Sequence, residues 1–134
     1  MSHFVDIVTM IKDVNALVRA LGRVGFSKDK VELHEQADYL YGYQGDKRSQ
    51  KANVILRRKY VGHASNDIGF ERQKDGSYLA HISEYDHGKY GKEWQDKLNT
   101  YYGVEKAKVE FEKKGMKYFE EVDEKQRPRL RVKI

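Results

Sequence analysis

The sequence contains no cysteine, a single proline and no long hydrophobic run. The lack of cysteine excludes disulfide scaffolds, thiolate zinc sites, iron–sulfur clusters and cysteine nucleophiles, and it fits a reducing compartment. No stretch approaches the about 18 consecutive apolar residues that suggest a transmembrane helix, and the first residues lack the basic and apolar segments of a signal peptide. We therefore expect a cytoplasmic protein that is neither secreted nor inserted in a membrane.

The length and composition fit one folded domain. The chain has 134 residues, and domains most often contain about 100–150. Charged residues make up 35% of the chain, hydrophobic residues 39% and aromatic residues 12%, a composition too aromatic for disorder. No repeat or proline-rich linker divides the sequence, so we expect a single domain over residues 1–134 with a small aromatic core.

Positive charge is concentrated in two segments. Residues 47–59 contain six lysines and arginines, residues 125–134 contain five, and neither segment contains an acid. These eleven cations exceed the net charge of +5, so the rest of the chain is net acidic. Such segregation produces either a phosphate-facing patch or two solvated strand faces, and the choice depends on whether the segments lie together in the fold.

Two helices are predicted from hydrophobic periodicity. The first covers residues 14–21, where apolar residues recur every three or four positions after the capping residue Asp13. The second begins near Lys92. Its later part, residues 107–111, also alternates with the period of a strand, but Lys113-Lys114-Gly115 is typical of a helix C-terminus and favours a helix.

The remaining apolar segments read as strands. They are residues 4–8, 31–43 as one or two strands, 52–58, 67–72, 78–82, 118–122 and 129–134. Asp75-Gly76 predicts a hairpin turn between two of them, because such turns require positive φ angles. The predicted fold class is α+β: a mostly antiparallel sheet with two helices packed on one face, and a C-terminal β-hairpin.

Several short motifs, taken in order, resemble one known family. They are Met1-Ser2-His3-Phe4, Tyr41-Gly42-Tyr43-Gln44-Gly45, Asn53-Val54-Ile55, Asp67-Ile68-Gly69-Phe70, Asp75-Gly76 and Tyr101-Tyr102. Their order and spacing resemble the hypothetical chloroplast reading frame thirty-five family, a domain of unknown function in plastids, cyanobacteria, other bacteria and phages. The resemblance covers nearly the whole chain and implies a fold without a reaction. Family members are often encoded near an ATPase of the AAA type, which implies an adaptor role.

The clearest physical pattern lies at the C-terminus, where this chain is more basic than the family usually is. The alternating cations are Arg127, Arg129, Arg131 and Lys133, and their apolar neighbours are Pro128, Leu130, Val132 and Ile134. Alternation places all four cations on one strand face, about 6.6 Å apart, close to the about 7 Å between phosphates on an extended nucleic-acid strand. The alternative is a solvated edge strand, whose charges and proline prevent edge-to-edge association.

Two further groups are candidates for widening this basic surface. Arg57 and Arg58 belong to the first basic segment. Tyr39, Tyr41 and Tyr43 repeat at period two and would offer a stacking platform for unpaired bases, with cross-strand packing as the alternative. No sequence motif of a known nucleic-acid-binding module accompanies them.

Neither a metal site nor a catalytic site is predicted. The five histidines are His3, His34, His63, His81 and His87. No two have the helical spacing of a zinc protease motif, and no cysteine is present to complete a ligand set. Glu84-Tyr85-Asp86-His87 is the densest ionisable cluster, but neighbouring strand residues point to opposite faces. An enzyme of unrecognised class that uses His87, Glu84 or His3 requires a hollow enclosing at least two of them.

The sequence therefore favours a non-enzymatic binding or adaptor protein without a cofactor. The predicted binding surface is basic and comprises Arg57, Arg58, Arg127, Arg129, Arg131 and Lys133. A protein partner, such as the ATPase that the resemblance suggests, is the first expectation, and a nucleic acid bound through its backbone is the alternative. A free sheet edge would also allow copies of the chain to associate.

Overall fold

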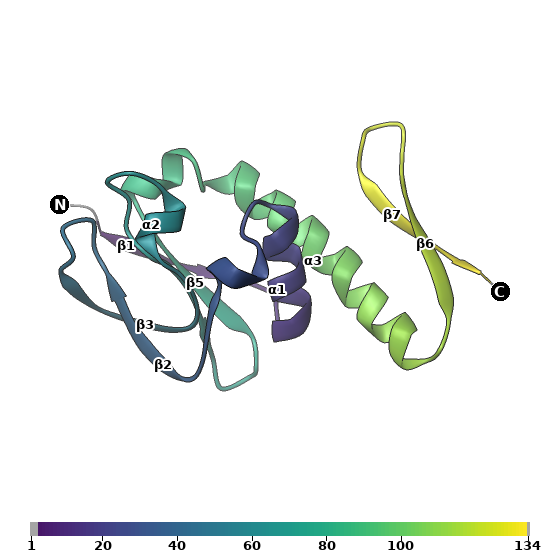
Figure 1. The fold of residues 1–134 in the computed structure, drawn as a ribbon, viewed down its shortest axis with the longest axis horizontal. Coiled ribbons are helices and arrows are strands. Elements are labelled where there is room, and N and C mark those ends of the chain that lie inside the picture. Colours follow the sequence, from purple (N-terminus) through teal and green to yellow (C-terminus); the bar gives the residue numbers. More distant parts are fainter. Residues whose placement is uncertain (1–2, 134) are drawn as a thin grey trace.

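The computed structural model describes residues 3–133, which are drawn in Figure 1. Met1, Ser2 and Ile134, which belong to the opening motif and to the predicted last strand, lie outside the described residues. The elements are β1 (Phe4–Val8), α1 (Val14–Arg23), η1 (Lys28–Lys30), β2 (Glu32–Tyr41), β3 (Lys47–Leu56), α2 (Arg58–Val61), β4 (Ile68–Arg72), β5 (Tyr78–Ser83), η2 (Tyr85–Gly88), α3 (Lys92–Lys113), β6 (Lys117–Val122) and β7 (Pro128–Lys133).

Five strands form one antiparallel sheet in the order β1-β5-β4-β3-β2, and β6 pairs with β7 in a separate two-stranded sheet. The predicted turn between β4 and β5 is present, and Gly76 adopts the positive φ of 87° that the turn requires. The predicted α+β class and the C-terminal hairpin are therefore confirmed.

Helices α1 and α3 pack on one face of the large sheet, as predicted. Asp13 caps α1 by accepting a hydrogen bond from the Ala16 N–H at 3.1 Å. Leu17 of α1 and Leu98 of α3 belong to the same buried cluster as Phe70 of β4. The main core of the protein therefore lies between these helices and the sheet.

The β2–β3 hairpin, at one edge of this sheet, carries buried residues outside the main core. Leu40 and Ala52 are buried with Ile55 in a second, smaller cluster, and Phe4 packs against it. A Cβ atom at Gly69 would lie 2.5 Å from the Ala52 Cβ and 2.9 Å from the Leu40 Cδ2. Only glycine at this position of β4 therefore lets the hairpin approach so closely.

Helix α3 connects the sheet to the last hairpin. Its 22 residues span about 33 Å at 1.5 Å per residue. Gly115 ends it with a φ of 66°, and the Met116 N–H donates to the Phe111 carbonyl at 2.9 Å, so the expected helix through residues 107–111 is confirmed. Figure 1 shows β6 and β7 beside the last part of α3, at the end of the molecule far from the β2–β3 hairpin.

Two local predictions were wrong. Tyr43 does not share a strand with Tyr39 and Tyr41, because β2 ends at Tyr41 and the Gly42 N–H donates to the Asp46 carbonyl at 2.8 Å to close a turn. The strand predicted for residues 52–58 ends at Leu56, because the Arg58 N–H donates to the Asp67 carboxylate at 2.7 Å and residues 58–61 form a single helical turn.

Candidate functional site

The β6–β7 hairpin, called the ribbon below, has two different faces. In its register Tyr118 lies opposite Val132 and Glu120 opposite Leu130, so these four side chains share one face. This inner face is held against the helices: the Tyr118 hydroxyl donates to Glu112 at 2.5 Å, and its ring lies 6.1 Å from that of Phe111. The inner face therefore has a packing role.

The other face of the ribbon points away from the helices. This outer face consists of Lys117, Phe119, Glu121, Arg129, Arg131 and Lys133. It carries four cations, one acid and one aromatic ring, and apart from the half-buried Glu121 each of these residues is exposed. The cationic row expected from the last strand is thus joined by two residues of the neighbouring strand, Lys117 and Phe119.

The one acid of the outer face lies between two arginines. Glu121 Oε1 is 2.9 Å from the Arg129 Nε and 2.7 Å from the Arg131 Nε. The hydrogen bond from Arg129 is the main cause that lowers the pKa of Glu121. Within residues 3–133 the terminal nitrogens of both guanidiniums make no hydrogen bond to the protein, so they keep donors for a ligand.

Two features of the outer face do not contribute to folding in an evident way. Lys117 lies directly opposite Lys133, an arrangement of like charges that destabilises a strand pair. Phe119, opposite Arg131, leaves 52% of its surface exposed. An anionic ligand with an apolar part would relieve both costs.

Arg127 lies in the turn of the ribbon rather than in the row. Its Nε–H donates to Asp123 at 2.8 Å and its backbone N–H donates to the same carboxylate at 2.9 Å. The backbone bond from Arg127 is the main cause that lowers the pKa of Asp123. This arginine stabilises the turn, and its side chain is still 65% exposed.

Arg57 lies in the sheet and is saturated with partners. Its guanidinium donates to both oxygens of Glu32 at 2.8 and 2.9 Å, to Asp38 at 3.0 Å, and to Asp67 at 2.9 Å. It also donates to the Tyr39 carbonyl at 3.0 Å. The hydrogen bonds between Arg57 and Glu32 raise the pKa of the arginine and lower that of the acid. This side chain ties β2 to the segment before β4 and has no donor left for a ligand.

Arg58 lines a shallow hollow beside Arg57, and of the three tyrosines only Tyr41 lines it. The hollow is lined by Glu32, Tyr41, Gly45, Arg57, Arg58, Lys59 and Asp67. Arg58 donates to the Tyr43 carbonyl at 2.9 Å. Two lysine ammonium groups, Lys47 and Lys51, lie 4.5 and 4.6 Å from the centre of the Tyr39 ring. The tyrosines therefore do not form one open platform of three rings.

The two basic segments do not form one surface. Arg57 and Arg58 lie at the start of α2, whereas Arg129 and Arg131 lie in β7, and Figure 1 shows these elements at opposite ends of the molecule. The sequence left open whether these two segments adjoin. They do not, because the 22-residue helix α3 lies between them (Figure 1).

One histidine lies among carboxylates that have the geometry of a metal site. Ligand atoms of Glu32, His34 and Asp38 lie within 4.8 Å of one another. The His34 Nε2 is 2.9 Å from Glu32 and 4.0 Å from Asp38. Both carboxylates already bind the Arg57 guanidinium, so a positive charge occupies the place that a metal ion would take.

The other histidines have structural or exposed positions. His81 is buried in β5, with its Nδ1 2.7 Å from Asp6 of β1 and its Nε2 2.9 Å from Glu71 of β4, and so it links three strands. His3 and His63 are exposed.

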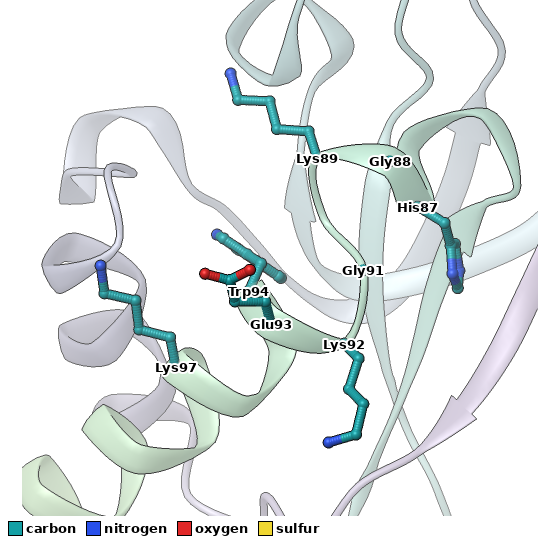
Figure 2. A pocket seen from close by; sticks show the side chains of 8 residues that line it. All are labelled: His87, Gly88, Lys89, Gly91, Lys92, Glu93, Trp94 and Lys97. Atoms are coloured by element: carbon teal, nitrogen blue, oxygen red, sulfur yellow. The ribbon is translucent and has the colours of Figure 1, made fainter.

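The start of α3 borders a hollow of about 460 Å³ that contains His87. Figure 2 shows that Lys89, Lys92 and Lys97 point in different directions and that the His87 ring turns away from the helix. The hollow is lined by His87, Gly88, Lys89, Gly91, Lys92, Glu93, Trp94 and Lys97. Only His87 of the three residues considered for catalysis lines this hollow, so the hollow does not meet the requirement set for an enzyme.

The most informative residues missing from the sequence-based surface are Lys117 and Phe119. Their strand was recognised, but they join the row only because the turn at residues 123–127 sets the register, with Asp123 and Arg127 closing it through a hydrogen bond of 2.9 Å. The letters of residues 117–122 do not alternate between polar and apolar, so the sequence carried no clear signal for this face.

The fold and the ribbon define the chain as an α+β protein with a separate cationic hairpin. A family described as a protein of unknown function (DUF1257) matches residues 26–131, more than half of the chain. The chain belongs to this family, and the expected membership in a family of unknown function is confirmed. No curated protein and no solved structure matches the chain. None of the helices within residues 3–133 has the length and hydrophobicity that crossing a membrane requires.

Proposed function

We propose that this protein is a non-enzymatic binding or adaptor protein that presents the outer face of the ribbon to an anionic macromolecule. The observation that carries the proposal is the unequal use of the two ribbon faces. The inner face packs on the helices, while the outer face exposes four cations around a single acid. A surface of this charge raises the local concentration of an anionic partner and orients its approach.

The like-charged pair of the outer face gives this proposal a sharp test. Lys117 and Lys133 face each other across the strands, and within residues 3–133 neither forms a salt bridge with an acid. The double variant Lys117→Gln/Lys133→Gln removes a repulsion, so the stability of the fold should stay the same or rise. Its affinity for a polyanion should fall, because two cations of the binding surface are lost.

Heparin chromatography over a NaCl gradient measures this affinity for an anionic polymer. The matched control is Lys47→Gln/Lys51→Gln, which removes the same charge from two exposed lysines of the β2–β3 hairpin. The ribbon variant should elute at lower salt than the control. Equal elution of the two variants would mean that the column responds to net charge alone, and the proposal would be wrong.

Arg57, Arg58 and the hollow beside them have no part in the proposed binding surface. Arg57 has all its donors engaged, and Arg58 lies at the other end of the molecule from the ribbon. The surface predicted from the sequence is therefore reduced to Arg129, Arg131 and Lys133, with Arg127 at its border and Lys117 added from β6. Two expectations stay predictions: that the protein partner is an ATPase, and that the protein is cytoplasmic.

A further inference from the structure

The charge of the outer face does not account for Phe119. This ring stands in the middle of β6 with 52% of its surface exposed, although two-stranded ribbons gain little stability from an exposed apolar residue. The other side chains of the outer face surround it: Lys117 and Glu121 are two positions away on the same strand, and Arg131 is directly opposite. The aromatic ring is therefore set among two cations and one acid, and that acid is itself paired with Arg129 and Arg131.

The spacing of that group fits a chain of phosphates. Arg129, Arg131 and Lys133 follow one another at every second position of β7, about 6.8 Å apart along an antiparallel strand. Arg131, the middle cation, is the one beside Phe119. A nucleic-acid strand that runs along β7 with its bases turned toward β6 would place them over the ring.

We propose that the outer face of the ribbon binds single-stranded nucleic acid, with Phe119 stacking on a base while Arg129, Arg131, Lys133 and Lys117 contact the phosphates. The inference rests on the proposed function and names the partner of that same surface. Proteins that bind single strands combine cations that follow the backbone with aromatic side chains on which bases stack. In a duplex the faces of the bases are covered by their neighbours, so Phe119 adds affinity only for the single strand.

The experiment measures fluorescence anisotropy with a labelled single-stranded oligonucleotide and with the duplex of the same sequence, in a series of salt concentrations. The variant Phe119→Leu keeps an apolar side chain without a stacking face, and Phe119→Trp keeps the stacking face. Phe119→Leu should weaken single-strand binding about five- to 150-fold, the range that loss of one stacked base gives. Binding to the duplex should not change, and Phe119→Trp should bind the single strand at least as well as the natural protein.

The salt series tests the phosphate contacts separately. Lys117→Gln/Lys133→Gln should reduce the slope of log affinity against log salt by about 0.7 for each lost contact with a single strand. The slope of Phe119→Leu should equal that of the natural protein, since the ring contacts no phosphate. Circular dichroism spectra of all variants check that the exposed substitutions leave the fold intact.

Failure of this inference is distinguishable from failure of the proposed function. If heparin retention depends on Lys117 and Lys133 but Phe119→Leu binds the single strand as tightly as the natural protein, the single-strand inference is overturned and an acidic protein becomes the partner to seek. An equal loss for single strand and duplex overturns it as well. If heparin retention does not depend on the two lysines, both proposals are wrong.

Discussion

The Nη2–H of Arg23 donates to Glu120 Oε2, with 2.6 Å between the nitrogen and the oxygen, and this ion pair joins the last hairpin to the first helix. Arg23 also donates to Glu105 of α3 at 2.9 Å, and Lys108 lies 2.7 Å from Glu120 and 3.1 Å from Glu105. Three elements are thus connected by one group of charges. Because these contacts use the inner face of the ribbon, its outer face is left exposed to solvent.

Glu105 is the centre of this group, and its replacement should loosen the ribbon. Its side chain is 5% exposed and contacts Arg19, Arg23 and Lys108. Glu105→Gln keeps the shape but removes the charge that balances three cations, so we expect a loss of about 2 kcal/mol in the free energy of unfolding. Urea denaturation followed by circular dichroism measures this loss.

The matched control for that variant is Glu110→Gln on the same helix. Glu110 pairs with Lys106 and Lys113 and is 40% exposed, and exposed pairs contribute less than about 1 kcal/mol. If the two variants unfold at the same urea concentration, Glu105 contributes no more to stability than an exposed ion pair does.

Acid should weaken the attachment of the ribbon. The hydrogen bond from Arg23 lowers the pKa of Glu120 from 4.5 to about 2, and that from Arg19 lowers the pKa of Glu112 from 4.5 to about 2. A carboxylate with a lower pKa in the folded state contributes stability that is complete above the unfolded value and is lost as the pH falls through the folded value. The expected loss therefore begins near pH 4.5 and is complete only below about pH 2.

Urea titrations at several pH values between 5 and about 2 follow this loss. Glu120→Gln has no carboxylate to protonate at this position, so its unfolding free energy should fall less over the same range than that of the natural protein. A pH dependence identical in the two proteins would contradict the assignment of the pKa shift to the contact with Arg23.

The parts of the fold that could be predicted are those with a local signal. Helix α1 follows from the apolar spacing after Asp13, and the β4–β5 turn follows from Asp75-Gly76. The alternating cations of the last strand predicted its exposed face. Each of these signals lies within a few residues of the feature it specifies.

The parts that could not be predicted depend on contacts between distant segments. Arg57 reads as a surface cation in the sequence, yet it meets Asp38 and Asp67 only because a bulged β2 lies next to β3. The charged residues have no periodicity in the sequence that would show which distant acid pairs with Arg57. Phe119 enters the candidate site for a similar reason, since the register of β6 against β7 decides which side chains it accompanies.

Arg57 should be one of the residues on which the stability of the sheet depends most. Asp67 is 1% exposed and has Arg57 as its cationic partner. Arg57→Lys replaces a planar fork of five donors by a single ammonium, so several of the bonds to Glu32, Asp38 and Asp67 are lost. We expect a loss of about 3 kcal/mol in the free energy of unfolding, as for other broken buried ion pairs.

The control for this variant is Arg58→Lys. The main contact of Arg58 with Asp67 is made by its backbone N–H, which the substitution preserves. The side chain contributes one bond, to the Tyr43 carbonyl, so a loss of at most about 1 kcal/mol is expected. Comparable losses in both variants would show that Arg57 is not the residue that connects β2 to Asp67.

Two glycines should respond to alanine in opposite directions. At Gly69 the new methyl group would lie 2.5 Å from the Ala52 Cβ, so the β2–β3 hairpin has to move and Gly69→Ala should cost about 2 kcal/mol. At Gly103, exposed in α3, nothing lies within 4 Å of the new Cβ atom. Gly103→Ala should stabilise the protein by about 0.5–1 kcal/mol, because alanine loses less backbone entropy in a helix. Thermal unfolding of both variants tests this packing directly. If Gly69→Ala melts at the same temperature as the natural protein, the Ala52 and Leu40 side chains do not pack against Gly69 as closely as the structure has them.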